Sequence, residues 1–327
     1  MTAPLLLFLL LAAPARALTP FVEQLRRAEA RGADDPERVE FATRALRAWR
    51  TSDGQALLAH AHFARAEGEV ARMDDASAEA DLTKTLDIDA RNERARLLRA
   101  RARAALGRGA EAERDALDYL AGKPEDAEGW LALGEARLAQ GAPKADQGAR
   151  AAFNKAAALL GGEDPRPSLG SGRAYLSARR DQDALAALSA AAERPKKYRA
   201  EILNWRARAY TALGDWSAAR KDLSQALPDL ERVLDERRRA GAVKRGRDAA
   251  QSTLADAYFR RGLSNEILGV PDGALADHRQ ACDLGLPPAC ARVNALEQQR
   301  PPAALKPKKR PRRKNPQSES GDRIYAN

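Results

Sequence analysis

The pattern of apolar and polar positions is dominated by small residues that return at a nearly constant interval. Alanine recurs at steps of 34 to 37 residues, with a longer last step of 55, where the second helix of a helical hairpin requires a small side chain: Ala78, Ala112, Ala149, Ala184, Ala219 and Ala274. A second series falls where two helices would cross closely: Ala66, Ala100, Gly134, Gly172, Ala207 and Gly262. Two small positions locked to one period predict stacked hairpins, each of which buries its apolar face only against its neighbours.

Alanine is common enough in this chain for one such series to arise by chance, so independent signals in the same register matter. Leu-Gly pairs lie between the two helices of three hairpins, where glycine supplies the left-handed conformation that ends a helix: Leu106/Gly107, Leu213/Gly214 and Leu268/Gly269. Proline closes hairpins at Pro124, Pro165 and Pro195 because it cannot continue a helix. No segment shows the period-two alternation of a strand, so we expect an all-α fold.

Two segments carry a family resemblance. Trp130, Leu133 and Gly134 reproduce the tryptophan, leucine and glycine spacing of the tetratricopeptide pattern. The segment LNWRARAYTALGDWSAARKDLSQAL places Tyr210, Leu213, Gly214, Trp216, Ala219, Leu223 and Ala226 at that family's positions. From about residue 59 to 288 the chain therefore resembles the tetratricopeptide repeat family, although the first two units lack its tryptophan and glycine. The resemblance implies a right-handed α-solenoid of antiparallel helix hairpins.

The period divides the chain into predicted units. We expect a tetratricopeptide-like solenoid over 59–299, with units at about 59–92, 93–126, 127–164, 165–199, 200–233 and 255–288. Degenerate capping helices are expected over 18–58, and a closing helix after the last unit, because the terminal units of a solenoid have one face in water. A basic insert at 234–254 contains the run ERRRAGAVKRGRD, which we expect to extend the preceding helix and then form a solvated loop broken at Gly241 and Gly246.

The first seventeen residues, MTAPLLLFLLLAAPARA, indicate a signal peptide. An apolar run of about ten residues is followed by Ala15-Arg16-Ala17, a small-x-small ending, so we expect cleavage after Ala17. No Lys or Arg precedes the apolar run, and an uncleaved hydrophobic start on a cytosolic protein is the alternative. Export would place the mature chain in a bacterial periplasm or outside the cell, and no later segment is long and apolar enough for a membrane helix.

The two cysteines, Cys282 and Cys290, lie at the ends of one turn in QACDLGLPPACARV. In the repeat register they come near the end of one helix and at the start of the next. The spacing resembles Sel1-like relatives of the tetratricopeptide family, whose ACxLGxxxAC turns carry a disulfide, and this resemblance implies a Cys282–Cys290 bond. Two free thiols are the alternative. A metal site is disfavoured, because His278 as a third ligand would leave zinc short of four.

Charge is concentrated at the C-terminal end of the chain. The formal net charge is +10, and most of it belongs to the Pro-rich tail over 300–327. A segment of this composition cannot bury enough apolar surface to fold alone, so we expect it to be disordered. It either binds a polyanion, such as anionic lipid, an acidic glycan or nucleic acid, or only keeps the chain soluble. The basic residues of the expected polyanion site are Lys306, Lys308, Lys309, Arg310, Arg312, Arg313 and Lys314.

The first helices of such hairpins form the concave face of the solenoid, which is where this family binds its partners. Residues just after each small position, and one turn earlier, should point into that groove. The candidates are Phe63, Glu67, Leu97, Arg101, Leu131, Glu135, Leu169, Arg173, Asn204, Arg208 and Phe259. Apolar residues beside charges of both signs suit an extended or helical peptide, and Arg173 and Arg208 could receive a carboxylate. The alternative is that the apolar members belong to the core.

Signatures of an enzyme are absent from the sequence. His60 and His62 are two residues apart and would point to different faces of a helix, His278 occupies a packing position, and no glycine-rich phosphate loop is present. We expect neither a cofactor nor a metal. The sequence favours an exported, non-catalytic scaffold that binds a protein or peptide in its groove within a cell-envelope assembly. The alternatives are a polyanion- or surface-binding protein that acts through its tail, and an enzyme of unrecognised type.

Overall fold

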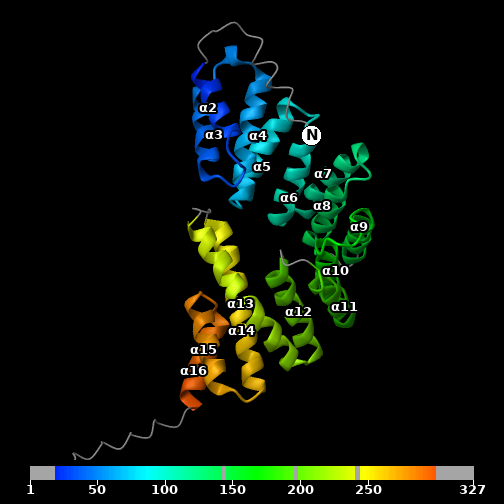
Figure 1. Ribbon diagram of the computed structural model, residues 1–327, viewed down its shortest axis with the longest axis vertical. Helices are drawn as coiled ribbons and strands as arrows, with labels where there is room; N and C mark the ends of the chain where they lie inside the picture. Colours follow the sequence, from blue (N-terminus) through cyan, green and yellow to red (C-terminus); the bar gives the residue numbers. More distant parts are fainter. Residues whose placement is uncertain (1–18, 142–144, 195–197, 240–243, 300–327) are drawn as a thin grey trace, which may run out of the picture.

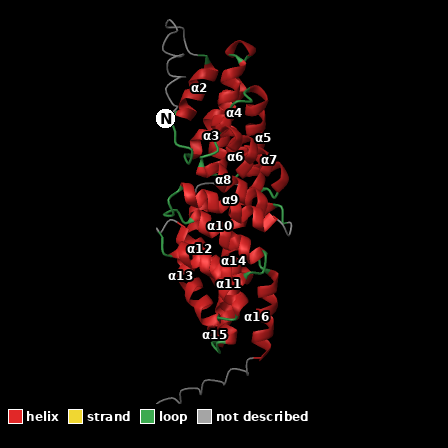
Figure 2. Ribbon diagram, turned by 90° about the vertical axis from the view of Figure 1, so that its right-hand side faces the viewer, coloured by secondary structure: helices red, strands yellow, loops and turns green. Residues whose placement is uncertain are grey.

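The computed structural model of the chain describes residues 19–141, 145–194, 198–239 and 244–299. Within these ranges the protein is an all-α solenoid without a strand, as the sequence predicted. Figure 1 shows the hairpins following one another along the long axis, from α2 and α3 at the top to α15 and α16 at the bottom. Figure 2 shows the same stack from the side, with helices throughout. The expected signal peptide and the basic tail lie outside the described residues.

The described helices form seven antiparallel hairpins and a closing helix. Each hairpin has a first and a second helix, and a 3₁₀ helix at Thr51–Asp53 links the first two hairpins. The pairs are α2 (Pro20–Glu29) with α3 (Pro36–Ala48), α4 (Gln55–Ala71) with α5 (Asp75–Ile88), α6 (Glu93–Ala105) with α7 (Gly109–Gly122), α8 (Ala127–Ala139) with α9 (Ala145–Leu159), α10 (Arg166–Ser177) with α11 (Asp181–Ala192), α12 (Arg199–Leu213) with α13 (Trp216–Arg239), and α14 (Lys244–Ile267) with α15 (Pro271–Asp283), followed by α16 (Pro287–Gln299).

The recurring small residues lie where the helices pack most closely. All six alanines of the first series are fully buried, as are the alanines of the second series. A Cβ added at Gly134 would lie 2.5 Å from the Phe153 ring, and one at Gly172 would lie 2.5 Å from Leu188. Any larger side chain at these positions would force the two helices of a hairpin apart, because a close-packed interior has no spare volume. The period in the sequence is therefore the period of helix packing.

The three hairpin turns with a Leu-Gly pair have the glycine at positive φ, as predicted, but two other turns have a larger residue at this position. Gly107, Gly214 and Gly269 have φ values of +77°, +80° and +71°. In the α4–α5 and α10–α11 turns the same position is occupied by Met73 and Arg179, each with φ of 57°. The left-handed conformation costs a residue with a Cβ roughly 1 kcal/mol, so these two turns are less favourable than the glycine-containing ones.

The basic insert lengthens two helices. Both α13 and α14 have 24 residues, against 10 to 17 for the other helices. Pro228 lies inside α13, where a proline removes one backbone hydrogen bond and favours a bend. The expected loop is shorter than the sequence suggested: Gly246 lies within α14 and does not break it, since neighbouring helix formers and packing outweigh one glycine. Gly241 lies outside the described residues.

A buried ion pair that the sequence analysis missed joins the two helices of four hairpins. Each pair links an arginine just before the small position to an aspartate sixteen residues later, through two hydrogen bonds of 2.5 to 2.9 Å. The pairs are Arg65–Asp81, Arg99–Asp115, Arg206–Asp222 and Arg261–Asp277. All four aspartates are buried. In the two intervening hairpins the equivalent residues are Leu133 with Ala152, and Ser171 with Ala187.

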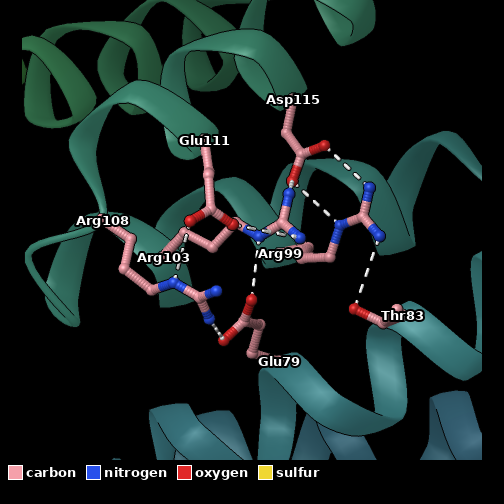
Figure 3. Close-up of polar contacts among 7 residues, drawn as sticks. All are labelled: Glu79, Thr83, Arg99, Arg103, Arg108, Glu111 and Asp115. Atoms are coloured by element: carbon pink, nitrogen blue, oxygen red, sulfur yellow. Dashed lines mark hydrogen bonds and ion pairs between the residues drawn. The ribbon is translucent and has the colours of Figure 1, made fainter.

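Around Arg99 the pair extends into a network that joins neighbouring hairpins (Figure 3). Arg103 donates to the same Asp115 carboxylate at 2.8 Å and to Glu79 of α5 at 3.0 Å. Arg108 binds Glu79 at 2.5 Å and Glu111 at 3.1 Å. The arginines thus connect α5, α6 and α7, so that this polar cluster has a defined geometry only when both hairpins are folded.

The C-terminal end of the solenoid carries a disulfide. The Cys282 and Cys290 sulfur atoms lie 1.99 Å apart and link α15 to α16. His278 is fully buried beside this end, where its Nε2 lies 2.6 Å from Glu266, consistent with the packing role expected of it. Within the described ranges, none of the helices combines the length and apolar character needed to cross a membrane.

Reducing this disulfide should loosen the closing helix without unfolding the solenoid. Because the bond closes a short loop, its removal is expected to cost about 2 kcal/mol, and α16 has a neighbour on one side only. Hydrogen exchange measured with and without reductant should show faster exchange in 287–299 and unchanged exchange in α6 to α9. The Cys282→Ala/Cys290→Ala variant should match the reduced protein, and uniform exchange changes along the chain would contradict this expectation.

Candidate functional site

The first helices of successive hairpins form a continuous inner surface with three adjoining cavities. Helices α6, α8, α10 and α12 contact one another in order along this surface. The cavities have volumes of about 310, 520 and 540 Å³, and Arg173 of α10 borders all three. We call this surface, over α6, α8, α10, α12 and α14, the inner groove. An elongated surface of this kind can hold a segment of another chain rather than a small molecule.

The central cavity of the inner groove is the one of about 310 Å³, lined by residues of α6, α8, α10 and α12. It combines an apolar floor with charged walls. Leu131 of α8 and Leu169 of α10 are buried in the floor. Glu128 bridges Arg101 and Arg166, with Arg166 Nη2 at 2.7 Å from its Oε1. Burial would raise the pKa of the Glu128 carboxyl, but the hydrogen bonds from Arg166 and the charge of Arg101 outweigh it, so its pKa is below the usual value. The walls are therefore charged at neutral pH.

Glu201, at the start of α12, faces the same cavity from the opposite wall. Its side chain is exposed by surface area, yet protein surrounds it on several sides because the groove is concave. Burial in the groove raises the pKa of Glu201, Arg173 opposes the increase, and Glu135 adds to it. Arg237, on the extended part of α13, is also close enough to lower this pKa. The basic insert thus brings a charge of its own to the inner groove.

The third cavity is built around the half-buried tryptophan Trp205. The guanidinium carbons of Arg208 and Arg173 lie 4.1 and 5.5 Å from the centre of the Trp205 ring. Arg208 also donates to Asp256 of α14 at 2.7 Å, and Arg173 donates to Glu135 at 2.8 Å. Arginines stacked on an indole ring keep their outer edge free to bind a partner. We call this cavity, between α10, α12 and α14, the Trp205 cleft.

Some of the predicted groove residues line the cavities, and the others pack against the core or are held in ion pairs. Six of them line the three cavities: Arg101, Leu131, Glu135, Leu169, Arg173 and Arg208. At the N-terminal end, Leu97 is buried, Phe63 packs against the core, and Glu67 is held between Arg38 and Arg94 at 2.5 and 2.7 Å. Whether any of these residues contacts a partner is still a prediction.

Two of the predicted groove residues pack against other side chains away from the three cavities, Asn204 in the interior and Phe259 half-buried. Asn204 is only 2% exposed, and Phe259 packs on the ring of His278 at 5.3 Å. Leu97, Leu131 and Leu169 occupy the same repeat position as Asn204 and are 5 to 8% exposed, so burial at this position is common to the hairpins. At α12 the next residue, Trp205, lines the groove.

Several groove residues were missed by the sequence analysis. Tyr198 and Glu201 border the central cavity, while Trp205, Trp216 and Arg260 border the Trp205 cleft. The tryptophans were visible in the sequence, but a tryptophan in a repeat is more often a packing residue, and nothing distinguished these two. Arg260 comes from α14, whose position depends on the insert that precedes it.

Each of the three histidines lies beside a carboxylate of a neighbouring helix. His60 lies beside Glu29, and His62 Nδ1 lies 2.9 Å from the buried Asp81 carboxylate. In the part of the chain that the structure describes, no group of three or more His, Cys, Asp or Glu side chains is arranged to hold a metal ion.

Comparisons with known proteins identify the fold. No protein-family model matches the sequence, and no curated protein matches it. A tetratricopeptide repeat protein from Parabacteroides merdae ATCC 43184 has a TM-score of 0.60 at 17% identity, over 85% of this chain and 99% of that chain. PilW, a widely conserved type IV pilus biogenesis factor, has a TM-score of 0.52 at 19% identity, over 68% of this chain and 91% of that chain. The chain thus has the tetratricopeptide fold that the sequence predicted.

Proposed function

We propose that this tetratricopeptide-fold protein is a non-catalytic scaffold that holds a protein or peptide partner in its inner groove. The observation that carries the proposal is the run of three adjoining cavities along α6 to α14, with Arg173 common to all of them. The groove offers apolar contacts in its floor and charges of both signs in its walls. Such a surface binds an extended or helical segment through apolar anchors, while the flanking charges set its register.

We further propose that the protein acts in a cell-envelope assembly of a bacterium. The signal-peptide pattern over residues 1–17 supports export. The two cysteine sulfurs at bonding distance support an oxidising compartment such as the periplasm. The fold is shared with PilW, a type IV pilus biogenesis factor, so a tetratricopeptide solenoid is suited to work in such an assembly.

A second candidate function rests on the composition of the tail. The segment from Arg300 to Pro316, RPPAALKPKKRPRRKNP, holds eight basic residues and no acidic one. This segment would bind an anionic lipid surface or another polyanion without sequence specificity, and its affinity would fall steeply as salt increases. The solenoid would then act as a spacer.

Charge reversal in the inner groove tests the first proposal. Arg173→Glu is expected to weaken capture of the partner from an envelope extract by about tenfold or more, because it places a third carboxylate beside Glu135 and Glu201. Capture should be measured with full-length and tail-deleted protein at two salt concentrations. A photo-crosslinker at Leu169 should then label the same partner.

The matched control is Arg114→Glu, which reverses an exposed arginine on the second helix α7. It should leave capture unchanged, and both variants should keep the circular dichroism and melting midpoint of the natural protein. Loss of all binding on deletion of 300–327, with no effect of Arg173→Glu, would reject the groove and select the tail.

A further inference from the structure

We propose that the Trp205 cleft receives an acidic peptide segment that carries an aliphatic or aromatic residue between its carboxylates. The inference rests on the proposed function of the inner groove, of which this cleft is the C-terminal part. The inference specifies that the partner segment is acidic and that its apolar residue lies in the Trp205 cleft. Charge complementarity, an unmet hydrogen-bond donor and exposed apolar side chains support it independently.

The cleft has more positive charge than its own carboxylates neutralise. Arg173, Arg179, Arg208 and Arg260 line it, against Asp181 alone. Arg208 and Arg260 share one carboxylate oxygen of the neighbouring Asp256, at 2.7 and 2.8 Å. One carboxylate cannot satisfy two planar guanidinium groups, each with five N–H donors. Donors are therefore available for carboxylates of a partner, which arginine binds in a bidentate manner.

Arg208 shows the imbalance most directly. Its Nε is buried and has no hydrogen-bond acceptor among the described residues. Burial lowers the pKa of Arg208, and the charges of Arg260 and Arg173 lower it further, while Asp256 opposes both effects. A carboxylate entering the cleft would accept hydrogen bonds from this group and would screen the repulsion among the arginines. Binding would thus remove an unfavourable interaction that exists in the free protein.

The same cleft exposes apolar surface next to its arginines. Trp205, Trp216, Leu176 and Leu263 line it. Ile267 lies one helical turn beyond Leu263 on the same face of α14 and is 56% exposed. Leu213 follows the lining residues Thr211 and Ala212 and is 37% exposed. Large exposed aliphatic residues next to a cavity are typical of a surface that a partner covers.

Arg179 is held at the rim of the cleft in an unfavourable backbone conformation. Its φ is 57°, as at Met73 in the α4–α5 turn, whereas the same turn position in four other hairpins is glycine. The side chain is exposed and lines the cleft, so Arg179 adds a positive charge at the rim.

A peptide fits the cleft better than a nucleic acid does. Asp181 lies in the lining, and Asp256 and Glu135 lie just behind the arginines. A continuous phosphate backbone would place charges beside these carboxylates, whereas a peptide can place its carboxylates at the arginines and an apolar residue elsewhere. Leu176, Leu263 and Ile267 offer packing for an aliphatic side chain rather than stacking for a base. A peptide with alternate acidic and apolar residues can bind the arginines and also pack on the aliphatic side chains.

Selection from a random peptide library displayed on phage tests the inference with full-length protein. We expect the recovered sequences to be enriched in Asp and Glu around one Leu, Ile, Phe or Trp. Sequences that also bind a variant with Arg179→Gly and Arg260→Gln are subtracted, which removes peptides held by the basic tail, because the variant keeps the tail. Recovery of neutral or basic sequences would overturn the inference.

Affinity measurements on a recovered peptide locate its site. By fluorescence anisotropy, Arg179→Gly and Arg260→Gln should each weaken binding by about fivefold. The matched control Arg180→Gln changes the next residue, which stacks on Tyr175 and pairs with Asp183 outside the cleft, and should stay within about twofold of the natural protein. Arg179→Gly should also raise the melting midpoint, since it relieves a positive φ. A purely structural Arg179 would give no loss of binding.

The outcomes separate this inference from the proposed function. If Arg173→Glu abolishes capture of the partner while Arg179→Gly and Arg260→Gln change nothing, the inner groove stands and the acidic-peptide cleft falls. If none of the three variants affects capture or peptide binding, both fall. A 20-nucleotide single-stranded DNA that binds the tail-deleted protein and loses affinity in Arg260→Gln would replace the peptide by a nucleic acid and overturn the inference.

Discussion

Replacing Asp115 with alanine is expected to destabilise the solenoid by about 3 kcal/mol, because it leaves the half-buried Arg99 guanidinium without its carboxylate and removes one of the carboxylates that Arg103 binds. Asp115 accepts two hydrogen bonds from Arg99 at 2.8 and 2.9 Å and a third from Arg103 at 2.8 Å. Its side chain is 5% exposed, and Figure 3 shows both arginines converging on it. The loss should appear as a lower midpoint in urea unfolding followed by circular dichroism.

Two variants control this prediction. Asp118→Ala removes an exposed carboxylate from the same helix and should change stability by less than about 0.5 kcal/mol. Arg99→Leu/Asp115→Ala copies the Leu133 and Ala152 pair that the chain itself uses in the next hairpin. It should recover part of the loss, since no Arg99 charge is left buried, while Arg103 keeps its pairing with Glu79. A double variant less stable than Asp115→Ala would contradict this account of the pairs.

The second large effect is a pH dependence that Glu69 introduces. Glu69 lies at the end of α4 with its Oε2 buried and without a hydrogen-bond partner. Burial, together with the charges of Asp81 and Asp74, raises the pKa of Glu69 to about 8 against the opposing charges of Arg65 and Arg72. The carboxyl is therefore mainly neutral at pH 7, and the 3.5 Å approach of Arg65 to Glu69 is not a full ion pair there.

The sign of the effect follows from proton binding. Because the folded state holds the Glu69 proton more tightly than the unfolded state, its contribution to stability is present at low pH. That contribution is lost as pH rises from the unfolded pKa near 4.5 to the folded value near 8. Glu69→Gln keeps the neutral shape and removes the titration. The variant should match the natural protein near pH 4, be slightly more stable at pH 5, and be more stable by about 4 kcal/mol at pH 8.

The measurement is the difference in unfolding free energy between Glu69→Gln and the natural protein at several pH values, since the difference cancels the other titrating groups. Glu40→Gln, an exposed residue of α3, is the control and should give a flat difference. A Glu69→Gln difference that does not grow between pH 5 and pH 8 would show that the folded protein ionises this carboxyl without cost.

Asp81, a neighbour of Glu69, titrates in the opposite direction. Burial would raise the pKa of Asp81, but hydrogen bonds from Arg65 and His62 outweigh it and lower the pKa. Its contribution to stability is present at neutral pH and is lost only as pH falls through that lowered value. The two carboxyls lie close together, so their opposite behaviour is a result of which one the arginine reaches with good geometry.

The sequence predicted the hairpin stack because helix packing depends on local residue size. Ala112 and Gly172 must be small wherever two helices cross, and this requirement repeats with each hairpin. The Arg–Asp pairs were equally periodic, with arginine at 65, 99, 206 and 261 and aspartate sixteen residues later. They were not recognised because charged residues are normally exposed, and only packing shows that these carboxylates are buried.

The candidate site could be predicted only in part. Arg173 and Arg208 were expected on the concave face, and the structure places both beside one cavity. Asn204 was expected there too, but it is buried while Trp205 lines the groove. Leu131 and Leu169 occupy the same repeat position and are also buried, yet they border the central cavity. Which residues of a repeat position border a cavity depends on the side chains packed between neighbouring hairpins.

The sequence by itself determined that this chain is an all-α stack of hairpins, where three of the hairpins turn, and which small residues lie between helices. These features follow from local sterics, which a single repeat unit already contains. Only the tertiary structure decided which charges are buried in pairs, how the long helices α13 and α14 bring Arg237 and Arg260 to the inner groove, and that three cavities adjoin at Arg173. Those features depend on distances between residues far apart in the chain, which are set by the combined packing of all the hairpins.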